Sequence, residues 1–251
     1  MSFGVITCIA LLLTASATLA AEIKVLSGSA LFPVLEVLVP EFERQHRHKV
    51  ATDLDGPIGG VKKRIAAGEI ADVIIVSAQQ IEFLEARGKV IPGTRADLGE
   101  LGIGVFVRKG APKPDISTLD AFKRTLLAAK SIVYKDPGAG GQVSNRLLDA
   151  FERLGIAQQM KAKTVISMHR TERFDAVARG GVEIGFSQMS QIIATPTVDL
   201  LGPLPAAIQH YTLFSAAIAQ STRERDAAKA FITFLTTPAA VAVMKAKGFE
   251  R

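Results

Sequence analysis

The sequence predicts an α/β protein of two lobes, and three observations support this fold class. Strand-like and helix-like segments alternate from residue 22 to the end of the chain. The 251 residues are 48% hydrophobic and 22% charged, which is typical of globular proteins. Two clusters rich in proline and glycine, at 109–114 and 202–205, enclose a stretch long enough for a small lobe. We therefore expect mostly parallel sheets with right-handed crossovers.

Short apolar runs predict the strands. The run at 72–76 is continuous, as a strand buried on both faces requires. The other runs are short and are bounded by glycine or polar residues. In chain order, the predicted strands are 23–26, 50–54, 72–76, 102–107, 131–134, 164–167, 182–186 and 212–219.

Apolar residues spaced three and four apart predict the helices. Pro33 suits the first turn of the first helix, and Pro40 should kink or split that helix. Gly68 and Gly88 end the next two helices, and Ser117-Thr118-Leu119-Asp120 fits a capping box. The predicted helices are 31–42, 61–67, 81–86, 117–128, 142–154, 173–179, 224–235 and 239–247.

Residues 1–20 have the layout of a secretory signal peptide. Residues 1–21 contain no charged side chain, and an apolar core at 5–13 precedes a series of small residues that ends at Ala20 and Ala21. The alternative is an uncleaved anchor, for which the apolar core is short. We expect cleavage after Ala20 or Ala21, a periplasmic location, and a mature chain without the single cysteine, Cys8.

The proline and glycine clusters divide the mature chain into two lobes. Residues 21–104 and 206–251 would form a discontinuous lobe 1, and residues 105–205 would form lobe 2. The chain would then cross between the lobes twice. Such an arrangement predicts a ligand cleft between the lobes and a hinge beside it.

Composition and motifs disfavour several function classes. The net charge is +6, but the basic residues are scattered, tryptophan is absent and tyrosine occurs twice, which argues against a nucleic-acid platform. The sequence has no G-x-S-x-G elbow and no phosphate-binding P-loop. The four histidines are dispersed, and the most closely spaced pair stands among basic residues that would repel a metal ion. We therefore predict no catalytic residues, no metal and no cofactor.

Small and glycine-rich segments follow the predicted strands. In α/β sheets such segments lie at the carboxyl ends of strands, where helix N-termini and free amides attract anions. The alternative is that glycine and serine simply make tight turns and caps here. The segments are 27–29, 55–60, 77–79, 136–142 and 187–188. Together they predict a cleft for a small anion or polar ligand.

Four segments carry a resemblance to a known family. They are Ile65–Val73, Val76–Gln79, Asp136–Gly140 and Ala178–Phe186. Over most of the mature chain the sequence resembles the periplasmic molybdate-type substrate-binding proteins of ABC transporters, which have the type II periplasmic-binding-protein fold. The resemblance implies two lobes that close over a small ligand without catalysis. It also implies delivery to an ABC transporter permease in the inner membrane, and a monomer that binds no nucleic acid.

The resemblance is broken at two ligand positions. Molybdate binders of this family place one serine in the segment after the first strand and another in the segment after the second strand. At these two positions this chain has Ala30, with Ser29 adjacent, and Ile58 or Gly59. Loss of a hydroxyl donor to a charged ligand costs about 1.5–3 kcal/mol. A different oxyanion or a small organic carboxylate is therefore an alternative to molybdate. The resulting candidate ligand residues are Ser29, Ala30, Gly59, Gly60, Ser77, Gly141, Gln142, Ser187 and Gln188.

Two further functions stay open at the level of sequence. The protein could be an extracytoplasmic sensor that presents its ligand to a membrane receptor. It could also be an enzyme that reuses the fold, which requires a titratable group inside the cleft, such as Asp136, His169 or Arg170. For the binding protein we expect neutral backbone donors, rather than an ion pair, to hold the anion.

Overall fold

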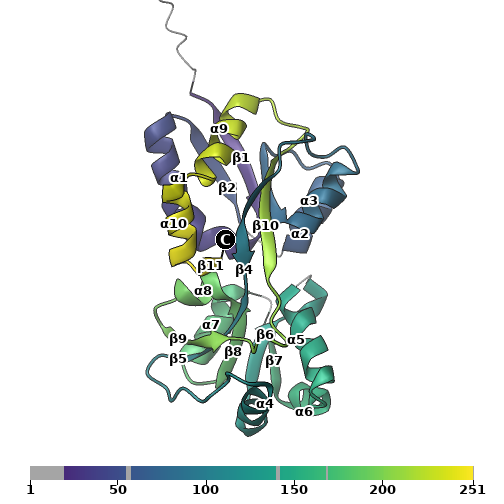
Figure 1. The fold of residues 1–251 in the computed structure, drawn as a ribbon, viewed down its shortest axis with the longest axis vertical. Coiled ribbons are helices and arrows are strands. Elements are labelled where there is room, and N and C mark those ends of the chain that lie inside the picture. Colours follow the sequence, from purple (N-terminus) through teal and green to yellow (C-terminus); the bar gives the residue numbers. More distant parts are fainter. Residues whose placement is uncertain (1–19, 55–57, 140–141, 168, 251) are drawn as a thin grey trace, which may run out of the picture.

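The computed structural model describes residues 20–250 except 55–57, 140–141 and 168. The predicted leader therefore lies, up to residue 19, outside the described residues, as does Cys8. Figure 1 shows two bodies stacked along the long axis, each with a sheet flanked by helices. The first sheet has the strand order β11-β4-β10-β3-β1-β2, and the second has the order β7-β6-β8-β5-β9. We call the body around the first sheet lobe 1 and the body around the second sheet lobe 2.

Lobe 1 combines the two ends of the described chain. Its strands are β1 (Glu22–Ser27), β2 (Lys49–Asp53), β3 (Val73–Ser77), β4 (Ala96–Leu101), β10 (Thr212–Ile218) and β11 (Phe249–Glu250). Its helices are η1 (Ser29–Leu31), α1 (Phe32–His46), α2 (Ile58–Ala66), α3 (Ala78–Glu85), α9 (Arg225–Leu235) and α10 (Pro238–Ala246). The helix α1 continues through Pro40, so the predicted split does not occur.

Lobe 2 is built from the middle of the chain. Its strands are β5 (Ile103–Arg108), β6 (Ile132–Lys135), β7 (Thr164–Ser167), β8 (Ile184–Gln188) and β9 (Val198–Pro203). Its helices are α4 (Leu119–Ala128), η2 (Pro137–Ala139), α5 (Gln142–Arg153), α6 (Ala157–Lys163), α7 (Arg170–Ala178) and α8 (Met189–Ile193). The α4 cap is Thr118, whose hydroxyl accepts the Ala121 amide at 3.1 Å, so the capping box predicted to start at Ser117 is wrong.

The expectation of mostly parallel sheets is wrong. Strand β1 pairs in parallel with β2 and β3, and β6 pairs in parallel with β7 and β8. Strands β10 and β5, however, run antiparallel to both of their neighbours. The reason is that the chain enters lobe 2 directly from β4 into β5 and returns from β9 to β10, so these strands carry the crossings instead of βαβ units. The domain boundaries predicted above stay a prediction.

The apolar cores of the two lobes are separate, and the core of lobe 2 consists of two clusters. Phe42 and Phe231 make an edge-to-face contact in lobe 1, with ring centroids 4.9 Å apart. In lobe 2, Phe106 stacks on Phe174 at 4.6 Å. An added Cβ at Gly185 would lie 2.1 Å from the Phe106 ring, so this strand position admits only glycine. Within the described ranges no single helix is long and apolar enough to span a membrane, although α9 and α10 together meet that criterion across a 60° bend.

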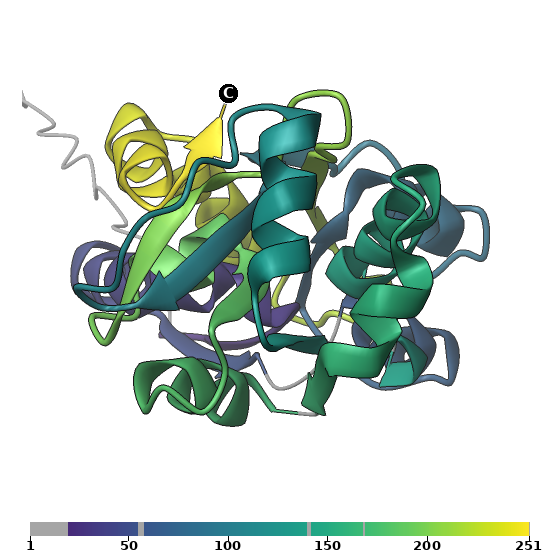
Figure 2. The same ribbon diagram turned by 90° about the horizontal axis from the view of Figure 1, so that it is seen from below.

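Helices of lobe 1 and lobe 2 lie on corresponding sides of the molecule. Helices α2 and α3 of lobe 1 lie on the same side of the molecule as α5 and α6 of lobe 2, while α10 lies on the other side (Figures 1 and 2). The short helix α8 follows the cleft end of β8 and contacts α1 and η1 of lobe 1. There the Ser190 hydroxyl donates to the Ala30 carbonyl at 2.7 Å. The helix α8 therefore contacts lobe 1 next to Ser29 and Ala30, the first predicted ligand residues.

Candidate functional site

A chain of side-chain hydrogen bonds crosses from lobe 2 to lobe 1. The Arg173 Nη2 donates to Ser187 Oγ at 3.3 Å. The Ser187 hydroxyl donates to Gln191 Oε1 at 2.6 Å, and Gln191 Nε2 donates to Ser29 Oγ at 3.1 Å. Ser187 and Ser29, both predicted from the sequence, are thus brought together through Gln191, which was not predicted.

The direction of this chain follows from chemistry. A guanidinium can only donate, so the Ser187 oxygen accepts from Arg173 and its own proton goes to Gln191. The Gln191 oxygen is then occupied, and its amide nitrogen faces Ser29. Ser29 accepts that hydrogen bond and donates to no acceptor among the described residues, so its hydroxyl proton can be donated to a ligand. Arg173 therefore orients Ser29 as a donor, which suits an anion.

Arg173 is a buried cation with unsatisfied donors. Its side chain projects from the first turns of α7 and is 4% exposed. The Nε and Nη1 groups have no hydrogen-bond partner, and within the described part of the chain no carboxylate forms an ion pair with this guanidinium. Burial, followed by the charge of Arg170, lowers the pKa of Arg173 to about 10. The guanidinium consequently remains charged at neutral pH.

A second cation lies near Arg173. Lys135 is half-buried at the cleft end of β6, where its carbonyl accepts a hydrogen bond from the Ser144 hydroxyl. Burial lowers the pKa of the Lys135 amine, and the positive charge of Arg173 lowers it further. Two cations that repel each other therefore share this end of lobe 2, an arrangement that an anion would stabilise.

The remaining predicted ligand residues divide into three groups. Ser77, Gln142 and Gln188 each carry a buried side-chain oxygen without a partner. Ala30 is buried and its carbonyl is taken by Ser190. Gly59 and Gly60 lie in the first turn of α2, and Gly141 lies outside the described residues. Among the described residues, the side-chain oxygens of Ser77, Gln142 and Gln188 are thus available for further hydrogen bonds.

The titratable groups singled out from sequence have structural partners. The Asp136 carboxylate accepts the Gly138 amide at 2.8 Å within a turn. His169 caps α7 and forms a capping box with Glu172. The Arg170 guanidinium lies 5.0 Å from the centre of the Phe32 ring, which places it against lobe 1. The perturbed groups of the site are instead Arg173 and Lys135, which sequence reasoning missed.

One signal could have found Arg173. Helical spacing aligns it with Val177, and its neighbour Phe174 is also apolar, so the sequence places a charge on the buried face of α7. Lys135 gives no such signal, because a lysine at a strand end is ordinary. The prediction that neutral backbone donors, rather than an ion pair, hold the anion did not consider these two cations and stays a prediction.

Comparisons with known proteins identify the family and the fold. A family model described as bacterial extracellular solute-binding protein matches residues 23–250. The chain is 33% identical over 250 residues to an aconitate isomerase of Pseudomonas sp, covering 96% of this chain and 94% of that protein. It is 26% identical over 245 residues to the molybdate-binding protein ModA of Azotobacter vinelandii, covering 94% of this chain and 93% of that protein.

A solved structure shows the same fold. The periplasmic molybdate-binding protein of Azotobacter vinelandii superimposes with a TM-score of 0.75 at 24% identity, over 91% of this chain and 99% of that chain. The two-lobed fold and the resemblance to molybdate-type binding proteins are therefore confirmed. The chain belongs to the family of bacterial extracellular solute-binding proteins.

Proposed function

We propose that the protein binds a small organic carboxylate between its lobes, in the periplasm, and delivers it as a monomer to an ABC importer. The observation that carries this proposal is the guanidinium of Arg173, which is buried, charged and has two unpartnered N–H-bearing nitrogens. An unpaired buried charge costs several kcal/mol. An anionic ligand that pairs with the guanidinium removes this cost, and the free energy recovered contributes to the affinity for that ligand.

The residues of lobe 1 complement this charge with a neutral donor. Ser29 is linked to Arg173 through Gln191 and Ser187, and its hydroxyl can donate a hydrogen bond to the ligand. The second cation, Lys135, adds a further charge-assisted donor. A carboxylate accepts hydrogen bonds on both oxygens and carries the charge that the two cations require.

Molybdate fits this site less well. The two serine positions of molybdate binders fall here on Ala30 and on Ile58 or Gly59, so their hydroxyl donors are missing. The charged donors Arg173 and Lys135 lie in lobe 2, away from those two positions in the sequence. The similarity to a protein named aconitate isomerase, which acts on a carboxylate, supports the same ligand class.

Thermal denaturation of the mature protein tests the proposal. The probes are short carboxylates, molybdate, sulfate and neutral sugars, and each response is followed by calorimetric titration. A carboxylate at 100 times its dissociation constant should add about 2.7 kcal/mol of stability. Stabilisation by molybdate, sulfate or a sugar without any response to carboxylates would overturn the proposal. Uptake of the labelled carboxylate, lost when the protein is deleted, distinguishes an importer from a sensor.

A second candidate function is isomerisation of an unsaturated carboxylate. It is supported by the 33% identity to an aconitate isomerase and by Lys135, because the lowered pKa of its amine increases the unprotonated fraction that could accept a proton. Proton NMR of cis- and trans-aconitate incubated with the protein tests it. Interconversion that disappears in Lys135→Met, while binding persists, supports catalysis. Unchanged spectra beside measurable binding exclude it.

A further inference from the structure

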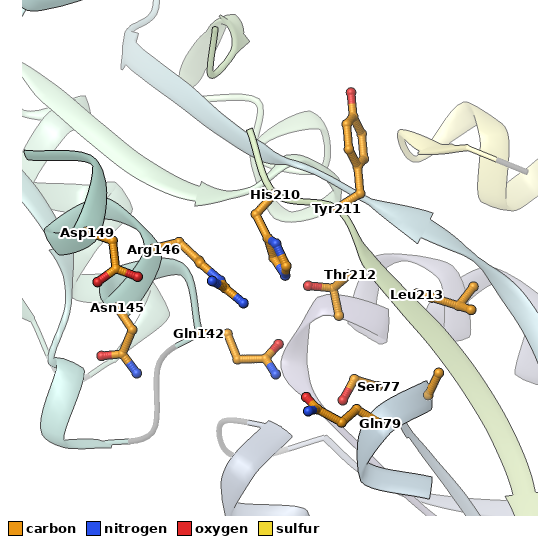
Figure 3. Close-up of a pocket in the computed structure, with 11 residues that line it drawn as sticks. Ser77, Gln79, Gln142, Asn145, Arg146, Asp149, His210, Tyr211, Thr212 and Leu213 are labelled. Atoms are coloured by element: carbon orange, nitrogen blue, oxygen red, sulfur yellow. The ribbon is translucent and has the colours of Figure 1, made fainter. Parts of the chain in front are cut away.

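A second polar compartment lies between the lobes. It is a cavity of about 430 Å³ bounded by α5 of lobe 2 and by β3, α3 and β10 of lobe 1. Ser77 and Gln142, two of the predicted ligand residues, line it. Figure 3 shows Gln142 and Gln79 approaching each other from opposite lobes. The compartment therefore continues the predicted ligand site toward the side where α3 and α5 lie.

Buried polar atoms in this compartment are unsatisfied. Ser77 is 5% exposed, and its hydroxyl has no hydrogen-bond partner. The side-chain oxygen of Gln142 is also buried without a partner. A buried polar group without a partner costs about 1–3 kcal/mol. The two oxygens are therefore available for hydrogen bonds with a molecule in this cavity.

The outer end of the compartment is cationic. Arg146 projects from α5 toward His210, which precedes β10 (Figure 3). Burial and the charge of Arg146 lower the pKa of His210, so its ring stays neutral at pH 7 and can donate one hydrogen bond. Asp149 lines the same cavity but lies beyond Arg146, on the side away from His210 (Figure 3). In the described parts of the chain, Arg146 has no ion-pair partner.

We infer that the ligand carries at least two anionic groups, one at Arg173 and Lys135 and another at Arg146 in the second compartment. This inference rests on the proposed carboxylate function and extends it to dicarboxylates and tricarboxylates. A volume of about 430 Å³ is within the range of small-molecule pockets, so it suits a carbon skeleton of several atoms. Ser77 and Gln142 would then contact the middle of the ligand.

Titration calorimetry with matched ligands tests the inference. The probes are butyrate, the dicarboxylates from succinate to adipate, and propane-1,2,3-tricarboxylate, with weak ligands measured by competition against the tightest one. The variant Arg146→Gln removes the proposed second charge. The control Arg153→Gln makes the same change on an exposed residue of the same helix, outside the cavity. Melting curves of both variants verify folding.

We expect at least one dicarboxylate or the tricarboxylate to bind about tenfold or more tightly than butyrate. Arg146→Gln should remove this advantage, while Arg153→Gln should leave both the advantage and butyrate binding unchanged. Equal binding of butyrate and all the longer anions would overturn the second subsite but leave the proposed function intact. An Arg146→Gln variant that still bound the longer anions more tightly than butyrate would also overturn the second subsite and leave the proposed function intact. Failure of every carboxylate to bind would overturn both.

Discussion

The two lobes differ in whether their arginine and lysine side chains near the sheets form ion pairs. In lobe 1, Arg64 forms ion pairs with Asp53 and Glu69, each at 2.5 Å. Lys24 pairs with the same Glu69 at 3.0 Å. These side chains are between about a quarter and a half exposed, so the network tolerates water. The cations of this network are neutralised within the lobe.

Two cations of lobe 2 have no such ion-pair partner among the described residues. Arg173 is buried and Lys135 is half-buried, and in the parts of lobe 2 that the structure describes neither forms an ion pair. A buried unpaired cation destabilises a lobe, whereas the network of lobe 1 has the opposite effect. Under the proposed function, lobe 1 would contribute neutral donors to the site and lobe 2 would contribute its charge.

Exchanging one arginine of each lobe for methionine should give opposite results. Arg173→Met removes two unpartnered donors and the charge, so we expect at least about 100-fold weaker carboxylate binding. The unliganded protein should be as stable as the wild type or more stable, because an unpaired buried charge is gone. Titration calorimetry and thermal melting measure the two effects.

The matched substitution in lobe 1 is Arg64→Met. It leaves Asp53 and Glu69 without this partner, so melting should occur at lower temperature while carboxylate affinity stays within about twofold. If Arg173→Met destabilised the protein and left affinity intact, the contrast between the lobes would be refuted.

Breaking the hydrogen-bond chain should have an intermediate effect. Gln191→Leu removes the link from Ser187 to Ser29, so the Ser29 hydroxyl is no longer oriented as a donor. We expect about tenfold weaker binding by calorimetry. The control Ser190→Ala deletes an inter-lobe hydrogen bond of the same helix to Ala30 and should change affinity much less. Equal losses from both variants would argue for general loosening of the lobe contact.

Ligand binding should take up protons at alkaline pH. In the free protein the pKa of Lys135 lies below its usual value, and an anion beside the amine raises that pKa. At about pH 9 the complex should therefore hold more protons than the separate components. Calorimetry in buffers of different ionisation enthalpy measures this uptake, which Lys135→Met should abolish and the exposed-site control Lys161→Met should retain. Proton release would contradict the assignment.

The smallest effect should come from the paired carboxylate of lobe 1. Hydrogen bonds from Arg64 and then Lys24 lower the pKa of Glu69 to about 2. Its stabilising contribution is therefore complete above about pH 4.5 and is lost as the pH falls through 2. Glu69→Gln should lower the unfolding free energy at pH 7 by about 1 kcal/mol or less, because the group is partly exposed. Urea denaturation should show the difference shrinking toward pH 2, with Glu36→Gln as an exposed control.

Much of the fold could be predicted, because apolar runs and periodic helices locate most elements. The missed elements have weak local signals. Strand β4 (Ala96–Leu101) is largely polar, and β9 (Val198–Pro203) ends in a Gly-Pro pair that suggests a loop. Helix α8 (Met189–Ile193) has five residues and depends on contacts with lobe 1. Antiparallel pairing of β5 and β10 is a property of the chain's path, which spacing does not encode.

The site was less predictable than the fold. Ser29, Ser77 and Ser187 were predicted because serine and glycine after a predicted strand can be recognised in the sequence as turn residues. Arg173 could have been found only from its place on the apolar face of α7, whereas Lys135 could not be separated from the many scattered basic residues because burial of a cation is a tertiary property. Gln191 likewise gains its role only where α8 meets lobe 1.

The central claim is that the charge of lobe 2 holds an anionic ligand, and titration with a matched pair of ligands tests it most directly. The pair is propane-1,2,3-tricarboxylate and its uncharged triamide, which share shape and size. With wild-type protein, the account predicts saturable binding of the acid at least about 100-fold tighter than that of the triamide. Equal affinity for the two compounds, or binding of the triamide alone, would contradict it.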